Sequence, residues 1–370
     1  MQPTRRQVSI ACYTLYDSVE VRKMRFIRFI ALLVAALVLV PVATALAHSP
    51  VFPEENHSLA TAYQIDDPAK SWATYTALEH TDAGDYYKFT MSSGDKINIS
   101  LLTPDSPSQS GFLPSFALLV PGLAQSDSVP AYIEVADGYG TIVVDGTDPG
   151  QAKYEPFSPG WYYELASLTM NAPNDGTYYV VVFDKAGNTG KYGLPVGYVE
   201  EFTPMELIMI PYNVHVVYVW EGQNQFVILL PIILALVIGG IVVYRRSRQG
   251  LAPKGISKWL AAFAGLAFLG SAASTIYQML LAFSVTGATG EALLTLLFVA
   301  ISIVLGVATL RYAVRAKPTL TPLRRVALIV IGIVALFGWS GLYFGPALAI
   351  IAAVVPPYAT KRSKDSVSGR

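Results

Sequence analysis

The run FVILLPIILALVIGGIVVY, residues 226–244, has 19 residues without a charge and divides the chain into two parts of different chemistry. A helix rises about 1.5 Å per residue, so this run is long enough to cross a bilayer core of about 30 Å. Residues 48–225 precede it and hold 22 of the 26 acidic residues against six lysines and no arginine, a formal charge of −16. We therefore predict an acidic domain followed by a membrane module.

Three further apolar runs follow, at 259–283, 292–310 and 326–355. The first two have 25 and 19 residues, and each predicts one membrane span. The last run has 30 residues, which is too long for one upright helix. Glycines and a proline in its middle predict either a broken helix or a tight hairpin, and we favour one broken segment. The module is therefore expected to have about four spans, followed by a basic tail at 356–370.

Basic residues orient the predicted spans. They fill the loop after the first span and the loop after the third, whereas the loop between the second and third spans has no Lys or Arg. Loops rich in Lys and Arg stay in the cytoplasm, so we expect a multi-pass protein of the cytoplasmic membrane with the acidic domain outside. The basic tail prefers the inner side, which favours the hairpin form of the last run, so the two indications conflict there.

The first residues predict a secretion signal. Residues 24–47 combine a basic start, an apolar stretch from Phe29 to Val40 and the sequence Ala45-Leu46-Ala47, which is typical of a signal peptide cleaved after Ala47. The alternative is an uncleaved anchor. Residues 1–23 contain the only cysteine, and we interpret them as a mis-assigned start or a cytoplasmic extension. A mature chain without cysteine excludes disulfide scaffolds and thiol enzymes.

Residues 48–225 have the apolar pattern of β-strands. Polar and apolar residues alternate at 96–101, and β-branched or aromatic runs occur at 178–183 and 214–220. A short helix is expected at 69–78. Turn signals rich in Asp, Asn and Gly separate the predicted strands. The pattern predicts an all-β, jelly-roll-like antiparallel sandwich, followed by the α-helical membrane module.

Two stretches of this domain resemble a known family. The first is Asp82-Ala-Gly-Asp85-Tyr86-Tyr87-Lys-Phe89, followed by Gly94-Asp95-Lys-Ile97; the second is Asp175-Gly-Thr-Tyr-Tyr-Val-Val-Val182, followed by Gly190-Lys-Tyr-Gly-Leu194. They resemble the opening and closing strands of the bacterial and archaeal pre-peptidase C-terminal domain over about residues 55–200. The resemblance implies a sandwich with an accessory role in binding or targeting. Here a membrane module takes the place of the peptidase.

Acidic residues near turns suggest a calcium site. Asp145, Asp148 and Glu155 lie in Asp-Gly-Thr-Asp and Tyr-Glu-Pro-Phe sequences, and clustered carboxylates with carbonyls can supply the oxygens that calcium needs. Their spacing is not that of a twelve-residue calcium loop. The alternative, which we favour, is a solvated acidic surface, and the cofactor remains unknown.

His48 suggests a second metal hypothesis. Cleavage after Ala47 makes it the first residue of the mature chain, where the amino group and the imidazole can together chelate copper. Such a site needs a second histidine, and the chain offers His57, His80 and His215.

Motifs for catalysis and transport are weak. Gly338-Trp-Ser-Gly341 resembles the Gly-x-Ser-Gly of rhomboid proteases, but no histidine occurs in any apolar run, so the serine has no base. Gly270, Ser274 and Gln278 share one face of the second span, which predicts interhelical packing. No charged residue lies at mid-membrane depth, which argues against a secondary transporter. We predict a protein that is not an enzyme.

An aromatic cluster is the best candidate for a contact surface. Tyr154, Phe157, Trp161 and Tyr163 are predicted to contact a partner, although alternation along a strand also directs part of the cluster to the core. The predicted last strand ends at Trp220, which we expect at the membrane interface before a connector of five residues.

The sequence thus favours a membrane-anchored surface protein whose sandwich binds or senses a ligand or partner. The alternatives are a non-catalytic subunit of a membrane enzyme or transporter complex, and a copper-handling protein that uses His48. The expected partners are the lipid bilayer and other membrane or surface proteins, with no nucleic acid.

Overall fold

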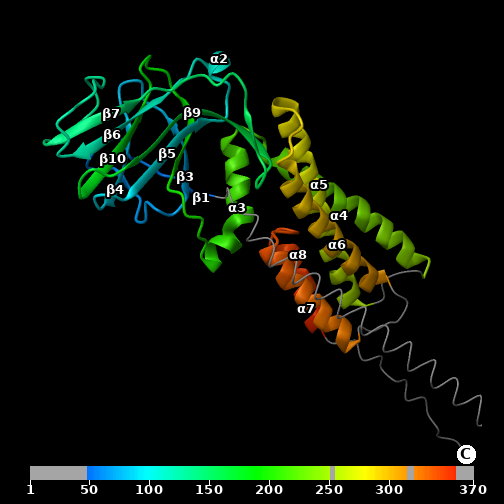
Figure 1. Ribbon diagram of the computed structural model, residues 1–370. Helices are drawn as coiled ribbons and strands as arrows, with labels where there is room; N and C mark the ends of the chain where they lie inside the picture. Colours follow the sequence, from blue (N-terminus) through cyan, green and yellow to red (C-terminus); the bar gives the residue numbers. More distant parts are fainter. Residues whose placement is uncertain (1–47, 251–254, 315–320, 356–370) are drawn as a thin grey trace, which may run out of the picture. The chain divides into compact units, whose positions relative to one another are not determined.

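The computed structural model describes residues 48–250, 255–314 and 321–355 (Figure 1). The described residues form two compact units. The first comprises residues 48–231 together with 273–299, and the second comprises the described residues of 232–272 and those from 300 onward. The predicted signal peptide, residues 1–23 and the basic tail lie outside the described residues.

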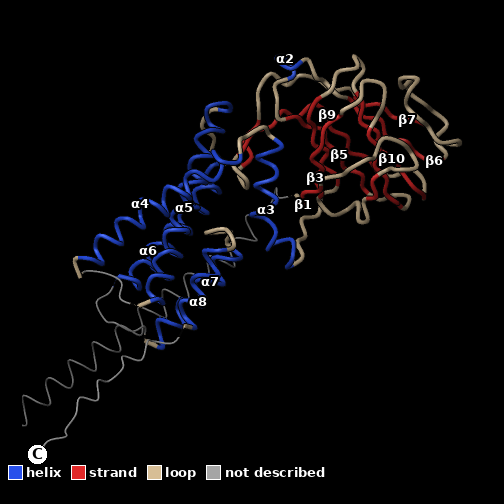
Figure 2. The backbone as a smooth tube through the Cα atoms, turned by 180° about the vertical axis from the view of Figure 1, so that it is seen from behind, coloured by secondary structure: helices blue, strands red, loops and turns tan. Residues whose placement is uncertain are grey.

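The first unit contains two β-sheets (Figure 2). The first sheet has six strands in the order β1 (Ser49–Val51), β3 (Trp72–Leu78), β11 (Gly190–Val196), β5 (Lys96–Thr103), β9 (Gly160–Asn171) and β8 (Lys153–Glu155). The second has five strands in the order β2 (Tyr63–Gln64), β4 (Asp85–Met91), β10 (Gly176–Phe183), β6 (Ser115–Pro121) and β7 (Tyr139–Val144). A short helix, α2 (Pro107–Ser110), precedes β6. Apart from β1–β3 and β2–β4, the strand pairs are antiparallel, so the predicted sandwich is confirmed.

Alternation along the strands places the core between the sheets. In β5, Ile97, Ile99 and Leu101 are at most 2% exposed, while the residues between them are more exposed. Strand β10 contributes Val180 and Val182 from the other sheet to the same apolar cluster. Burying such a side chain stabilises a fold by about 1.5–3 kcal/mol, so this cluster explains why the two strands predicted at 96–101 and 178–183 form.

Two local predictions in the first unit are wrong. Residues 69–78, predicted as a helix, contain β3, which pairs with β1 on one side and with β11 on the other. Residues 214–220, predicted as a strand, belong to the helix α3 (Pro204–Trp220). Its β-branched residues favour a strand, but a capping box between Thr203 and Glu206 starts a helix upstream.

Within the described residues, three helices are long and apolar enough to cross a membrane. They are α4 (Gln225–Arg248), α5 (Ile256–Thr286) and α6 (Ala292–Val314). They contain the predicted spans at 226–244, 259–283 and 292–310, which are confirmed at the level of length and composition.

The fourth apolar run forms a helical hairpin in the second unit. It contains α7 (Pro322–Phe337) and the shorter helix α8 (Phe344–Val354). Arg325, near the start of α7, donates a hydrogen bond to the carbonyl of Val355, just beyond the end of α8, at 2.8 Å. The two helices are therefore antiparallel. The hairpin replaces the single broken segment that the sequence favours, because the chain reverses at Trp339 and Leu342, which have φ angles of 52° and 53°.

Glycines bring α5 and α6 into close contact. A Cβ atom added to Gly306 would lie 3.0 Å from the carbonyl oxygen of Gly265 and 2.7 Å from Cγ of Leu269. Small residues at such crossings let two backbones approach, which is the usual way that helices pack in a membrane.

We expect Gly306→Ala to lower the midpoint of thermal unfolding in detergent. The added methyl group overpacks the crossing, which costs about 1–3 kcal/mol. Gly240→Ala in α4 is the matched control, because its Cβ would make only an ordinary contact of 3.5 Å with Phe263. Equal or higher stability of Gly306→Ala relative to the control would contradict this packing.

Candidate functional site

The hairpin of β8 and β9 directs consecutive side chains to different surroundings. Tyr154 pairs with Trp161 and Glu155 pairs with Gly160 at the edge of the six-stranded sheet. Neighbouring side chains of a strand point to opposite faces, so Tyr154 and Glu155 diverge. Tyr154 contacts residues of α5 and α6 that belong to the first unit, whereas Glu155 lines a cavity.

Tyr154 is bonded to the start of α6. Its hydroxyl lies 2.7 Å from the hydroxyl of Thr295, which in turn donates to the carbonyl of Pro156 at 2.6 Å. The tyrosine ring is 5.3 Å from the ring of Phe283 in α5. Tyr154 is only 3% exposed and Thr295 is fully buried. The sandwich and these helix ends are therefore joined by a buried polar contact within an apolar surround.

Of the four predicted partner-contact residues, Tyr154 is buried and the other three are partly exposed. Tyr154 is buried in its own chain, and Phe157 packs edge-on against Phe298 of α6 with ring centroids 5.8 Å apart. Trp161 packs against the same apolar cluster and donates from Nε1 to the carbonyl of Pro104 at 3.1 Å. Tyr163 is half-buried on β9. Tyr154 and Phe157 thus contact α5 or α6 of the same unit, which sequence alternation alone does not reveal, and contact of the cluster with another protein stays a prediction.

Helix α3 packs against the first sheet through its last residue. Trp220 donates from Nε1 to the carbonyl of Thr76 in β3 at 2.7 Å, and its ring meets the ring of Tyr75 edge-on at 5.0 Å. Trp220 therefore contacts the sandwich, and its place at the membrane interface stays a prediction. Because α3 ends here, Glu221 follows directly at the helix C-cap.

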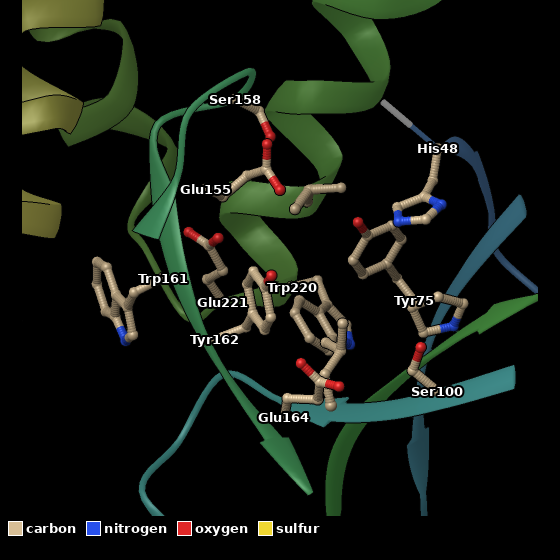
Figure 3. A pocket seen from close by; sticks show the side chains of 13 residues that line it. His48, Tyr75, Ser100, Glu155, Ser158, Trp161, Tyr162, Glu164, Trp220 and Glu221 are labelled. Carbon is tan, nitrogen blue, oxygen red and sulfur yellow. The ribbon is translucent and has the colours of Figure 1, made fainter. Parts of the chain in front are cut away.

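A cavity of about 100 Å³ lies between the β8–β9 hairpin, α3 and the first sheet (Figure 3). Two kinds of side chain dominate its wall. The carboxyls are those of Glu155, Glu221 and Glu164, and the aromatic rings are those of Tyr75, Trp161, Tyr162 and Trp220. His48 also lines the cavity. A larger hollow of about 650 Å³ shares His48, Glu155 and Tyr162 with it and extends to Glu291 in the loop between α5 and α6.

Glu155 is held by the backbone of its own turn. Its Oε1 accepts a hydrogen bond from the backbone N–H of Phe157 at 2.9 Å, and the N–H of Ser158 is a second donor. Burial of the carboxyl raises the pKa of Glu155 to about 7 against the effect of these donors, and the charges of Glu291 and Glu200 raise it further. The group therefore changes its charge near neutral pH.

Glu221 closes the cavity on the side of α3. Its Oε2 accepts from Nε2 of Gln223 at 3.0 Å, and a Cβ on Gly160 would lie 2.7 Å from its Oε1, so a larger residue at position 160 would displace this carboxyl. Burial raises the pKa of Glu221 to about 8, and the charge of Glu155 adds to the shift, while Gln223 and Lys191 lower it. A negative charge at a helix C-terminus is also disfavoured by the helix dipole.

A chain of amides continues from Glu221 into α5. Oε1 of Gln223 accepts from Nε2 of Gln278 at 2.8 Å, and Gln278 is 1% exposed. Its Oε1 has no hydrogen-bond partner among the described residues. On the same helix face, Ser274 donates to the carbonyl of Ile228 at 3.3 Å, as the packing interpretation predicts. Gln278 instead belongs to the surroundings of the site, which its sequence position does not indicate.

The three predicted calcium ligands are not brought together. Asp145 forms an ion pair with Lys185 at 2.5 Å, and Asp148 accepts from the N–H of Gly150 at 2.8 Å. Glu155 lies in the cavity, bonded to its own turn. Within residues 48–250, 255–314 and 321–355, no group of three or more His, Cys, Asp or Glu side chains is arranged to hold a metal ion.

His48 is bonded to a serine. Its Nδ1 lies 2.5 Å from the hydroxyl of Ser71, and burial lowers the pKa of the imidazole to about 4. His57 and His80 contact each other elsewhere, with ring centroids 5.2 Å apart, and His215 lies on α3. Among the described residues His48 belongs to no group of three or more His, Cys, Asp or Glu side chains suited to a metal, and the copper site stays a prediction.

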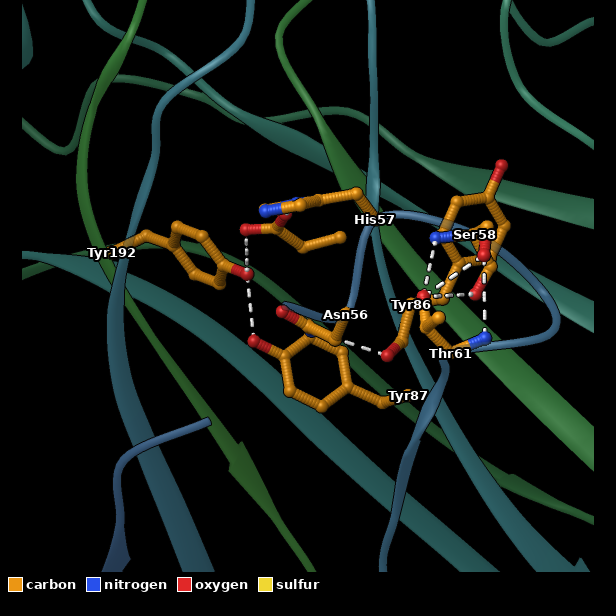
Figure 4. A network of polar contacts seen from close by, with 8 residues as sticks. Asn56, His57, Ser58, Thr61, Tyr86, Tyr87 and Tyr192 are labelled. Atoms are coloured by element: carbon orange, nitrogen blue, oxygen red, sulfur yellow. Dashed lines mark hydrogen bonds and ion pairs between the residues drawn. The ribbon is translucent and has the colours of Figure 1, made fainter. Parts of the chain in front are cut away.

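The motif that carries the family resemblance has a structural role (Figure 4). Asp85 of β4 is 1% exposed, accepts a hydrogen bond from the hydroxyl of Tyr192 at 2.7 Å and pairs with His57 at 2.7 Å. The hydroxyls of Tyr192 and Tyr87 are 2.6 Å apart. Because β4 and β11 belong to different sheets, this network links the two sheets through the core. Its hydrogen bonds satisfy a carboxyl whose pKa is raised by burial.

Comparisons with known proteins find only distant similarities. No protein-family model and no curated protein matches the chain. Among solved structures, it is similar to the pre-peptidase C-terminal domain of collagenase from Bacillus anthracis, with 20% identity over 38% of this chain and 94% of that chain and a TM-score of 0.23. It is also similar to the mercury-soaked secreted protein MopE of Methylococcus capsulatus, in which an oxidized tryptophan facilitates copper binding, with 14% identity over 30% and 69% of the chains and a TM-score of 0.15. Both TM-scores are low, so the fold assignment rests on the strand pairing.

We expect Thr295→Val to lower the stability of the folded chain. The substitution leaves the Tyr154 hydroxyl and the Pro156 carbonyl without their partner, and a buried unsatisfied group costs about 1–3 kcal/mol. Thermal unfolding of Thr295→Val, Tyr154→Phe and the double variant measures the coupling. The double variant should lose less stability than the two single variants lose together, and strict additivity of the two stability losses would contradict a direct bond.

The enclosed carboxyls predict a pH dependence of stability. The pKa values of Glu155 and Glu221 in the folded chain lie above the ordinary glutamate value, so each neutral carboxyl favours the folded state. This contribution to the free energy of unfolding is fully present below about pH 4.5 and is lost as pH rises through about 7 for Glu155 and about 8 for Glu221. The unfolding midpoint of the native chain should fall over this window. Glu221→Gln should flatten the fall, whereas Glu79→Gln, an exposed control, should not. Identical pH profiles for the native chain and Glu221→Gln would contradict the assignment.

Proposed function

We propose that this chain is a membrane-anchored sensing protein of the outer side of the cytoplasmic membrane. Its sandwich binds a ligand in the cavity lined by Glu155 and Glu221, and the change is passed to α5 and α6. The basic loops and the predicted signal peptide support the outer location. The proposed activity is binding rather than catalysis.

One observation carries this proposal: the residue that lines the cavity and the residue that contacts α6 are consecutive in one strand. Glu155 lines the cavity and Tyr154 is bonded to Thr295 of α6. A ligand that moves Glu155 must also act on Tyr154, because a short edge strand has little freedom between adjacent residues. A two-state element that contacts both sites is the physical requirement for coupling.

A second connection supports the same direction of coupling. Glu221 reaches α5 through the hydrogen bonds of Gln223 and Gln278, which are 3.0 and 2.8 Å long. Glu221 is thus connected to α5 by hydrogen bonds, whereas Glu155 is connected to α6 through its strand neighbour Tyr154. We expect a change in the charge of the cavity to act on both helix ends.

Hydrogen–deuterium exchange on the full chain in lipid nanodiscs tests the coupling without a known ligand. The double variant Glu155→Gln, Glu221→Gln keeps the size of both side chains and removes their charge. At about pH 8.5 we expect exchange at residues 286–299 to change by roughly threefold or more relative to the native chain, since local opening follows local contacts.

Two controls make this experiment decisive. Glu79→Gln should leave exchange at residues 286–299 at the native level. In a Tyr154→Phe, Thr295→Val background, the same cavity substitutions should alter exchange at 153–164 without altering it at 286–299. Unchanged exchange at 286–299 in the cavity variant alone would refute the coupling.

A further inference from the structure

The wall of the cavity combines two chemistries that attract one class of ligand. Figure 3 shows Glu155 and Glu221 on one side of the cavity, with the rings of Tyr75, Tyr162 and Trp220 around it. Carboxylate oxygens attract a cation through charge, and the faces of Tyr and Trp rings attract it through their quadrupole. An organic cation satisfies both, because its carbon atoms also pack against the rings.

A bare metal ion fits this wall less well. Calcium requires six to eight oxygen ligands, whereas much of the wall is aromatic. The described residues also hold no group of three or more His, Cys, Asp or Glu side chains suited to a metal. The aromatic faces are thus better explained by a ligand whose charged atom is surrounded by carbon groups.

The size of the cavity sets the size of the charged group. A volume of about 100 Å³ is several times what one water molecule needs, so it holds a group of a few heavy atoms. The adjoining hollow of about 650 Å³ shares three wall residues and leaves room for an uncharged remainder of the ligand. An ammonium head with a short tail has this shape.

Other charged groups around the cavity favour a cation on balance. Lys153 is held by Glu164 in an ion pair, and Lys191 acts on Glu221. The remaining titratable groups that act on the two carboxyls or line the wall are Glu200, Glu291, His48, Tyr75, Tyr162 and Tyr218. The domain as a whole carries a formal charge of −16, which attracts cations from solution.

We infer that the cavity binds the ammonium group of a small organic amine, with Glu155 and Glu221 as its counter-charges and Tyr75, Tyr162 and Trp220 as its aromatic wall. This inference rests on the proposed function, since it names the ligand class of the same site. A bound cation stabilises the ionised carboxylates, so binding at neutral pH releases protons. Affinity therefore rises with pH across the range in which these two groups ionise.

Calorimetry on the full chain in nanodiscs tests the ligand class, with tetramethylammonium and methylammonium chloride as the probes. We expect saturable binding at about pH 8.5, at least tenfold weaker binding at about pH 6, and proton release that appears as a dependence of the heat on the buffer. The two probes distinguish a ring-dominated site, which prefers tetramethylammonium, from a hydrogen-bonded one, which prefers methylammonium.

Variants connect the binding to the cavity. Glu155→Gln and Glu221→Gln should each lower the affinity for the tighter-binding probe at least tenfold. Tyr162→Leu should lower the affinity for tetramethylammonium, while Glu79→Gln should bind both probes as the native chain does. Each variant is compared with the native chain in circular dichroism and elution, and the native chain alone decides the matter if a variant does not fold.

Several results would overturn the inference. They are the absence of saturable binding of either ammonium ion to the native chain, binding that is equal at both pH values, or saturation by calcium in place of the ammonium ions. These outcomes are distinct from a failure of the proposed function: if residues 286–299 still respond to the cavity variants in hydrogen exchange, the coupling stands and only the ligand class is wrong.

Discussion

The bond between Tyr154 and Thr295 fixes the sandwich to the helix ends of the first unit. The two hydroxyls are 2.7 Å apart in an apolar surround formed by Phe283, Met279 and Ala282, where an unpaired hydroxyl is costly. The contact is therefore specific: the polar groups must meet in register for the apolar residues around them to pack. Once Tyr154 is placed, strand alternation directs Glu155 into the cavity, so the position of the site depends on the bond between Tyr154 and Thr295.

The region around the end of α3 stabilises the fold, yet it also contains Glu221, a buried carboxyl that destabilises the folded state when it is ionised. Glu221 ends α3, where the helix dipole disfavours a negative charge, and burial raises its pKa to about 8. A neutral side chain of similar shape at this position relieves both penalties. Enclosed groups that cost stability without an evident structural return are more frequent at functional sites, because charge is most effective where water is excluded. This contrast separates Glu221 from Asp85, whose hydrogen bonds tie the two sheets together.

Local pattern predicts the sandwich well and its attachments poorly. The alternation of Ile97, Ile99 and Leu101 indicates a strand with one buried face, and the core confirms it. The run at 214–220 has strand propensity, yet the capping box at Thr203 and the contact of Trp220 with Thr76 make it the end of a helix. Propensity is a weak indication, and tertiary contact overrides it. The contact of Tyr154 with Thr295 is likewise hidden from local pattern, because the two residues lie more than a hundred positions apart in the chain.

The candidate site shows the same limit. Glu155 is singled out in the sequence only as a calcium candidate beside Asp145 and Asp148, and Glu221 belongs to the predicted five-residue connector. What distinguishes them is enclosure by α3, β8 and β9, which are distant in sequence, and composition does not report enclosure. The acidic excess of the domain and the site are nevertheless related. A surface with formal charge −16 raises the local concentration of cations around it, but it selects none of them. Selection requires a place where water is removed and geometry is fixed, and the cavity between the β8–β9 hairpin and α3 is such a place.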